Sequence, residues 1–104
     1  MRSGRKLLAR WVLKMYKIAL KRSADKELAK ISKSDPKVGL KIRTFLRELE
    51  ARQNPFATNN VEKMQGYENR WRWRVGIHYR VIGLKQDEIL TIEIIEISSR
   101  EGAY

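Results

Sequence analysis

Arginines crowd the stretch from residue 70 to residue 80, which contains no acidic residue. Arg70, Arg72 and Arg74 alternate with other residue types, and Arg80 follows shortly after them. Arginine suits phosphate because its planar guanidinium donates two parallel hydrogen bonds to two oxygens and stays charged at physiological pH. The residue types and their spacing therefore predict an anion site, with phosphate as the anion that fits best.

Strand alternation decides whether these arginines meet. A strand over Trp71–Val75 puts Arg72 and Arg74 on one face. A two-residue turn after it would set Trp73 against Arg80, whereas a three-residue loop matches apolar with apolar residues. The pairs are then Val75 with Tyr79, Trp73 with Val81, and Arg74 with Arg80. Opposed like charges destabilise a strand pair, so either an anion binds there or the arginines serve to solubilise an exposed face; we favour the anion.

The side chains around the arginines have two interpretations each. Trp71 and Trp73 either stack on bases or pack beneath helices, and packing is favoured because the strand needs one buried face. His78 is either a proton carrier, since imidazole titrates near about pH 6.5, or a polar loop residue. Arg100 and Tyr104 either sit over the arginines or belong to a frayed C-terminus, and their sequence context does not decide.

The composition bounds the class of protein. The 104-residue chain carries a net charge of +11, from 23 basic and 12 acidic residues, which attracts polyanions such as nucleic acid. It has no cysteine and one histidine, which excludes disulfide frameworks, thiolate zinc sites, cysteine nucleophiles and multi-histidine metal sites. No apolar run approaches the ~18 residues of a membrane span, and no signal-cleavage pattern is seen. We expect one cytoplasmic domain with no membrane contact, metal or cofactor.

Residues 1–14 form a separate segment with five basic residues and no acid. Its apolar residues fall on one helical stripe, which is typical of a basic amphipathic helix that contacts a membrane or RNA. The other interpretation, which we favour, is a basic N-terminal leader or extension, with Met15 as the usual first residue. The globular domain would then span 15–104.

The elements that must position the arginines follow from periodicity. A short strand is expected at Tyr16–Leu20, followed by a helix over 24–33 with Ser23 as its N-cap. Asp35 caps a second helix that has Pro36 at its first position and runs to about residue 52. A loop is expected over roughly 53–69.

Three strands complete the chain, at Trp71–Val75, Tyr79–Leu84 and Ile89–Ile97, because these segments are rich in β-branched and aromatic residues. Lys85–Glu88 is expected to be a short hairpin connection, and Gly83 to mark a bulge or a close approach. The order β-α-α-β-β-β predicts an α+β domain. Its two helices pack on one face of a mostly antiparallel four-stranded sheet.

Taken together, several segments within 15–104 resemble the RelE/ParE toxin superfamily of type II toxin–antitoxin systems. The stretch that begins at Trp71, with its alternating arginines followed by a Tyr-Arg-Val-Ile run, is fairly specific to that superfamily. The matching pieces are Tyr16–Leu20, Ser23–Leu28, Lys63–Gly66, Trp71–Gly76, Tyr79–Ile82 and Arg100–Tyr104.

The resemblance implies the β-α-α-β-β-β fold and, in its RelE branch, an endoribonuclease that cuts messenger RNA in the ribosomal A site. The 2′-hydroxyl attacks the adjacent phosphate and yields a 2′,3′-cyclic phosphate and a free 5′-hydroxyl. The positions that match catalytic ones in that branch are Arg72, Arg74, Arg80, Arg100 and Tyr104. Those expected to contact the substrate are Lys63, Arg70 and His78.

The resemblance also implies a role for each catalytic position. Arg72 and Arg74 would assist the nucleophile and bind phosphate, while Arg80 would stabilise the charged transition state. Arg100 would help the leaving oxygen, and Tyr104 would stack on a base. Some relatives carry lysine in place of Arg72 and Arg74, and arginine is a poor general base, so the group that accepts the proton stays open.

The implied partners are messenger RNA on the ribosome, 16S ribosomal RNA and an acidic cognate antitoxin. Two alternatives from other functional classes remain. One is a ParE-type toxin that inhibits DNA gyrase without nuclease activity. The other is a non-catalytic RNA-binding module, in which the positive charge serves affinity alone.

Overall fold

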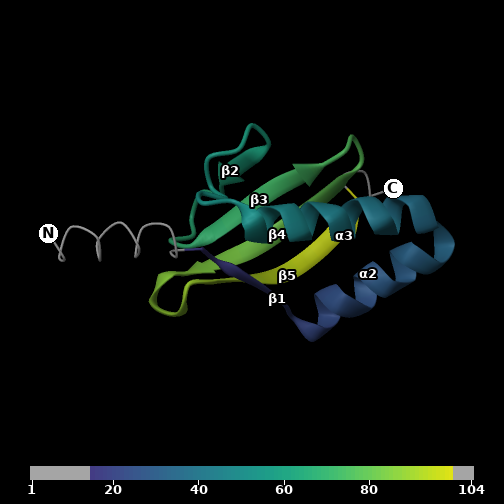
Figure 1. Ribbon diagram of the computed structural model, residues 1–104, viewed down its shortest axis with the longest axis horizontal. Helices are drawn as coiled ribbons and strands as arrows, with labels where there is room; N and C mark the ends of the chain where they lie inside the picture. The colour runs from purple at the N-terminus through teal and green to yellow at the C-terminus, as the bar shows by residue number, and fades with distance from the viewer. Residues whose placement is uncertain (1–14, 100–104) are drawn as a thin grey trace, which may run out of the picture.

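The computed structural model describes residues 15–99, which fold into two helices packed on a single sheet (Figure 1). In chain order the elements are β1 (Lys17–Leu20), α2 (Arg22–Ser34), α3 (Pro36–Ala51), β2 (Val61–Lys63), β3 (Arg70–Val75), β4 (Tyr79–Gln86), the 3₁₀ helix η1 (Asp87–Ile89) and β5 (Thr91–Ser99). The strand order is β1-β5-β4-β3-β2, with β1 parallel to β5 and all other neighbours antiparallel. The α+β architecture is confirmed, although the sheet formed by these residues has five strands where four were expected.

The core lies between the sheet and the helices, which cover one face (Figure 1). From β3, Trp73 is fully buried, and Trp71 is partly buried against the same core. The Trp73 indole Nε1 donates a hydrogen bond of 2.9 Å to the carbonyl of Pro55, so its polar atom is satisfied. The expectation that the tryptophans pack beneath the helices is confirmed for Trp73, and Trp71 packs against the same core beside Phe56.

The two helix starts test the capping expectations. Asp35 is confirmed as the N-cap of α3, since its Oδ1 accepts from the N–H of Val38 at 3.3 Å. Ser23 as N-cap of α2 is wrong, because α2 begins at Arg22 and follows Lys21. The Lys21 N–H donates to Ile94 of β5 at 2.8 Å, so the pairing of β1 with β5 fixes where the helix starts.

The helices approach each other closely where they cross. A Cβ placed on Gly39 of α3 would lie 2.2 Å from the Oγ of Ser32 on α2, so glycine is required at this position. The Ser32 Oγ is buried and has no hydrogen-bond partner. The absence of a side chain at Gly39 thus allows α2 and α3 to pack closely against each other.

The register of β3 and β4 is the expected one. Val75 pairs with Tyr79 and Arg74 with Arg80 across a three-residue turn. Both expectations for Gly83 are also met. The pairing of β4 with β5 shifts at Ile82/Gly83, and a Cβ on Gly83 would lie 2.7 Å from Ile92.

Two connections differ from expectation. The loop over 53–69 contains β2, a three-residue edge strand at Val61–Lys63 that pairs with β3. The prediction of a short hairpin connection at Lys85–Glu88 is also wrong, because β4 continues to Gln86 and η1 follows it. The chain then turns through Leu90, whose φ of 47° is left-handed, so β5 starts at Thr91.

The end of the sheet remote from the β3–β4 turn is closed by an aromatic cluster. The Phe56 ring centroid lies 5.2 Å from that of Tyr16 and 4.9 Å from that of Trp71. The Tyr16 hydroxyl donates to the carboxylate of Asp87 in η1. Burial of the phenol, followed by the hydrogen bond to Asp87 and its charge, raises the pKa of Tyr16 to about 12.

Candidate functional site

The face of the sheet turned away from the helices carries the predicted arginines. On β3, Arg72 and Arg74 alternate with the buried tryptophans, and β4 sets Arg80 directly opposite Arg74. Arg74 is exposed, whereas Arg72 and Arg80 are half-buried. We term these three residues the arginine face. Opposed cations cost free energy in a strand pair, so this geometry favours a bound anion.

A carboxylate from β2 reaches the arginine face. Glu62 is the cross-strand partner of Arg72, and its Oε2 lies 2.7 Å from Nη2 of that arginine. The Glu62 side chain is 65% exposed, so the ion pair is solvated and contributes at most about 1 kcal/mol. A phosphate that binds Arg72 therefore competes with Glu62.

Arg80 is oriented by a hydrogen-bonded chain from β5. Its Nε donates to the Oγ of Ser98 at 3.3 Å, and Ser98 donates to Oε2 of Glu96 at 2.9 Å. Among residues 15–99 nothing else bonds to this guanidinium. Its two terminal nitrogens are thus available to two oxygens of one phosphate.

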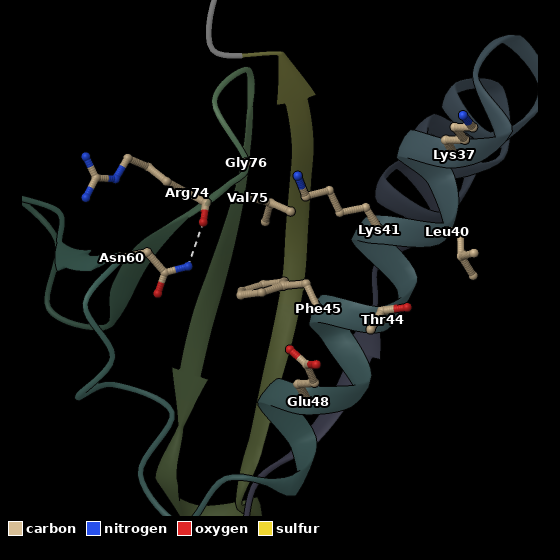
Figure 2. A pocket seen from close by; sticks show the side chains of 10 residues that line it. All are labelled: Lys37, Leu40, Lys41, Thr44, Phe45, Glu48, Asn60, Arg74, Val75 and Gly76. Atoms are coloured by element: carbon tan, nitrogen blue, oxygen red, sulfur yellow. Dashed lines mark hydrogen bonds between the residues drawn. The ribbon is translucent and has the colours of Figure 1, made fainter.

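The backbone of Arg74 is held by Asn60, which directly precedes β2. The Arg74 N–H donates to the Asn60 carbonyl at 2.9 Å, and Asn60 Nδ2 donates to the Arg74 carbonyl at 2.6 Å. Thr58 fixes the amide by donating to Asn60 Oδ1 at 2.6 Å. Figure 2 shows the Arg74 guanidinium directed away from α3, and no described residue bonds to it. Arg74 is therefore the arginine of this face most open to a ligand.

Two predicted substrate contacts lie at the other end of β3. Arg70 begins the strand and shares the open face with Arg74, four residues away. Lys63 is exposed and pairs with Trp71, so alternation sets it on the opposite side of the sheet from the arginine face. The structure thus brings Arg70 into line with the arginine face and separates Lys63 from it.

The other predicted residues lie toward the β3–β4 turn and the C-terminus. His78 is exposed in the turn that joins the strands of Arg74 and Arg80. Arg100 and Tyr104 follow β5 and lie outside the described residues.

The residues that hold the arginines were missed from the sequence. A signal existed for Glu96 and Ser98, which alternate in β5 and therefore share a face. For Asn60 and Glu62 there was none, because β2 has three residues and shows no periodic pattern.

A groove of about 560 Å³ runs between α3 and the end of β3 (Figure 2). Its helix side carries Lys37 and Lys41, one turn apart, and Leu40, which is 63% exposed. Figure 2 shows Lys41 and Phe45 reaching toward the strands. The groove is lined by Lys37, Leu40, Lys41, Thr44, Phe45, Glu48, Asn60, Arg74, Val75 and Gly76, and is both cationic and apolar.

Within residues 15–99 no three or more metal-ligating side chains come together as a group. In that same part of the chain, none of the helices has the length and apolar character needed to cross a membrane.

Solved structures of toxins share this fold. A mutant of E. coli RelE in the free state superposes with a TM-score of 0.67 at 20% identity, over 86% of this chain and 87% of that one. RelE in its complex with RelB from Pyrococcus horikoshii superposes with a TM-score of 0.65 at 24% identity, over 84% of this chain and 97% of that one. A YoeB/ParE toxin from Agrobacterium tumefaciens superposes with a TM-score of 0.67 at 19% identity, over 80% of this chain and 96% of that one.

The family comparison covers most of the chain. No curated protein matches the sequence. Residues 18–104 match the family model described as the ParE toxin of the type II toxin–antitoxin system parDE. The chain therefore belongs to the ParE toxin family, and the resemblance to the RelE/ParE superfamily is confirmed.

Proposed function

We propose that this member of the ParE toxin family is a ribosome-dependent endoribonuclease that cleaves messenger RNA in the A site of cytoplasmic ribosomes. The observation that carries the proposal is the opposed pair of Arg74 and Arg80, with Arg72 beside them on the same open face. Cations held close together on one face are suited to an anion whose charge grows during a reaction. A phosphodiester undergoing attack is such an anion.

In the proposed reaction, the ribose 2′-oxygen bonds to the adjacent phosphorus while the bond from phosphorus to the 5′-oxygen breaks. The products are a 2′,3′-cyclic phosphate and a 5′-hydroxyl. Arg80, held at Nε by Ser98, stabilises charge on the phosphoryl oxygens. Arg72 and Arg74 bind the phosphate and orient the nucleophile, which lowers the entropic part of the barrier. In the same scheme, Arg100 serves the leaving oxygen and Tyr104 stacks on a base.

One proton must leave the 2′-hydroxyl and one must reach the 5′-oxygen. Arginine stays protonated, so none of the three arginines accepts a proton. We assign the transfer to His78, which lies in the turn between the two strands of the arginine face. Lys63 and Arg70 are assigned to substrate contacts away from the cleaved bond, including 16S ribosomal RNA.

The test is mapping of messenger 5′ ends after ribosome-bound RNA is incubated with purified toxin. We expect cuts at fixed positions within codons, and a decrease of about 10²–10³-fold in cleavage rate for Arg80→Ala. Arg47→Ala is the matched control, because Arg47 is exposed on α3, away from the arginine face. If Arg80→Ala cleaved ribosome-bound RNA at the wild-type rate, the assignment of Arg80 to the site would be wrong.

A second candidate is inhibition of DNA gyrase without nuclease activity. The observation in its favour is the family model itself, which describes a ParE toxin. Double-stranded DNA breaks in expressing cells without codon-positioned RNA cuts would support this candidate. Absence of any growth effect would instead favour a non-catalytic RNA-binding module.

We further propose that an acidic antitoxin neutralises the toxin by docking in the groove beside α3. Lys37 and Lys41 attract acidic side chains, while Leu40 and Phe45 offer apolar contact to one stripe of an amphipathic segment. The solved neighbours include complexes with RelB antitoxins, and an open reading frame next to this toxin is expected to encode the acidic partner.

Charge reversal tests this docking surface. Lys37→Glu with Lys41→Glu is expected to weaken antitoxin binding at least tenfold and to restore toxicity during co-expression. The control pair is Arg43→Glu with Arg47→Glu, which has the same spacing and charge change on exposed positions of α3 outside the groove. Equal loss of binding in both pairs would indicate general charge attraction instead of a docking groove.

A further inference from the structure

A stacked tyrosine and arginine lie beyond the end of the arginine face. Tyr67, in the turn between β2 and β3, is 47% exposed despite its large ring. The guanidinium carbon of Arg70 sits 4.0 Å from the centre of that ring. The proposed mechanism assigns Arg70 only a general substrate contact, and it assigns no role to Tyr67. We term the pair the Tyr67–Arg70 ledge.

The ledge is fixed to the sheet by backbone hydrogen bonds on both sides. Met64 donates its N–H to the Arg70 carbonyl at 2.9 Å, and Lys85 of β4 donates to the Asn69 carbonyl at 2.7 Å. Gly66 turns the chain with a φ of +86°, a conformation that favours glycine. The tyrosine is thus presented from an anchored turn.

The Arg70 guanidinium stacks on the Tyr67 ring, and it makes no hydrogen bond to another residue of 15–99. Its Nε is buried and has no hydrogen-bond partner, and within residues 15–99 no ion pair engages the group. A planar cation placed on an aromatic ring can stack on a nucleobase, and the donors on its terminal nitrogens can bond to the edge of that base. An ordinary salt bridge would instead have turned the guanidinium toward a carboxylate.

The position of the ledge relative to the arginine face suits a single strand. Arg70 and Arg74 lie on the same face of β3, four residues apart, which corresponds to roughly 13 Å along the strand. A chain whose phosphate sits at Arg74 and Arg80 can therefore place another nucleotide near Tyr67. Aromatic groups beside a cationic track are the usual design for binding single strands.

We propose that the Tyr67–Arg70 ledge is a nucleobase-stacking site for single-stranded RNA whose phosphates lie on the arginine face. The proposal rests on the proposed function for the identity of the ligand, and adds a second point of contact remote from the reacting phosphate. Stacking is tolerant of base identity, so the ledge contributes affinity and register with little sequence preference.

The test is direct binding of two short oligonucleotides with the same number of phosphates. One is a single-stranded RNA with 2′-O-methyl riboses, which lacks the attacking hydroxyl, and the other is its abasic counterpart. We expect the full-length protein to bind the base-containing strand about tenfold more tightly. Tyr67→Leu removes this preference without weakening binding of the abasic strand, whereas Tyr67→Phe keeps it.

Arg74→Ala is the second variant, because it removes a proposed phosphate contact and should weaken binding of both oligonucleotides to the same extent. A base preference that is unchanged in Tyr67→Leu, or a wild-type protein that binds the two strands equally, would overturn the ledge. Thermal unfolding of each variant shows whether the loop change alters the fold.

The two proposals fail separately. Codon-positioned cleavage together with an unchanged base preference in Tyr67→Leu would support the endoribonuclease proposal and contradict the proposed stacking site. A base preference that depends on Tyr67, without cleavage on the ribosome, would support the Tyr67–Arg70 ledge as an RNA-binding site and contradict the endoribonuclease proposal.

Discussion

The two faces of β3 come from alternating residues of one short strand and differ in what surrounds them. On the covered face, Trp73 and Val75 are buried beneath the helices. On the open face, Arg74 is exposed and stands opposite Arg80. The covered face gains free energy from apolar burial, whereas the open face loses some through like charges.

This difference separates the residues that stabilise the fold from those that we propose to bind an anion. Loss of a side chain from the covered face should destabilise the protein and reduce activity only through unfolding. Loss of an arginine from the open face should leave stability equal or higher and reduce anion binding. Neighbouring positions of one strand therefore allow the two roles to be separated under matched conditions.

The largest expected effect is that of Trp73→Ala. The ring is fully buried and its Nε1 bonds to Pro55, so its removal leaves a cavity and an orphaned carbonyl. We expect a loss of about 3–5 kcal/mol in the free energy of unfolding, measured by urea denaturation. The adjacent Arg74→Ala is the control and should lose nothing. A loss below about 1 kcal/mol for Trp73→Ala would contradict the assignment of this face to folding.

The next effect concerns a buried polar group on the core side, Tyr16. Its pKa is raised to about 12 by burial and by Asp87, so the neutral phenol is favoured by folding. This preference stabilises the folded state fully below pH 10, the ordinary pKa of tyrosine. As the pH rises toward 12, the free energy of unfolding should fall by about 2–3 kcal/mol. Denaturation between pH 9 and roughly 12 should show this slope in the wild type.

Tyr16→Phe supplies the control for that slope. It keeps the ring packed against Phe56 but cannot ionise, so the decrease in stability with pH should become smaller. If both proteins lost stability equally over the same range, the titration would belong to other groups.

Features set by short-range pattern were predictable from the sequence. Alternation over Trp71–Val75 separated the two faces, and matching of apolar pairs fixed the three-residue turn and the opposition of Arg74 and Arg80. Asp35 followed by Pro36 marked the start of α3 for an equally local reason.

Features set by contacts between distant segments were not predictable. The start of α2 depends on the bond from Lys21 to Ile94, more than seventy residues away in the chain. Strand β2 has too few residues for a periodic signal, so the contact of Glu62 with Arg72 could not be foreseen. The sequence therefore predicted where the cations gather but not which groups hold and partly neutralise them.

A smaller effect tests the cost of opposed cations on the open face. Arg74→Gln is expected to raise the free energy of unfolding by about 0.2–1 kcal/mol at low salt, because it removes a like charge opposite Arg80. The gain should shrink at high salt, where the repulsion is screened. A double-mutant cycle with Arg80→Gln measures the coupling directly. A favourable coupling between the two arginines would show that the face is not strained.

The smallest expected effect concerns Glu62, whose carboxylate pairs with Arg72 and would compete with a phosphate bound there. Glu62→Gln should bind inorganic phosphate about 1.4–5-fold more tightly, since an exposed ion pair contributes about 0.2–1 kcal/mol. Glu88→Gln is the matched control, because Glu88 is exposed in η1 and lies away from the arginine face. Titration calorimetry at two salt concentrations separates local competition from net charge. Equal gains in both variants would mean that only the total charge matters, whereas a gain confined to Glu62→Gln shows that this carboxylate sets how strongly the open face attracts its ligand.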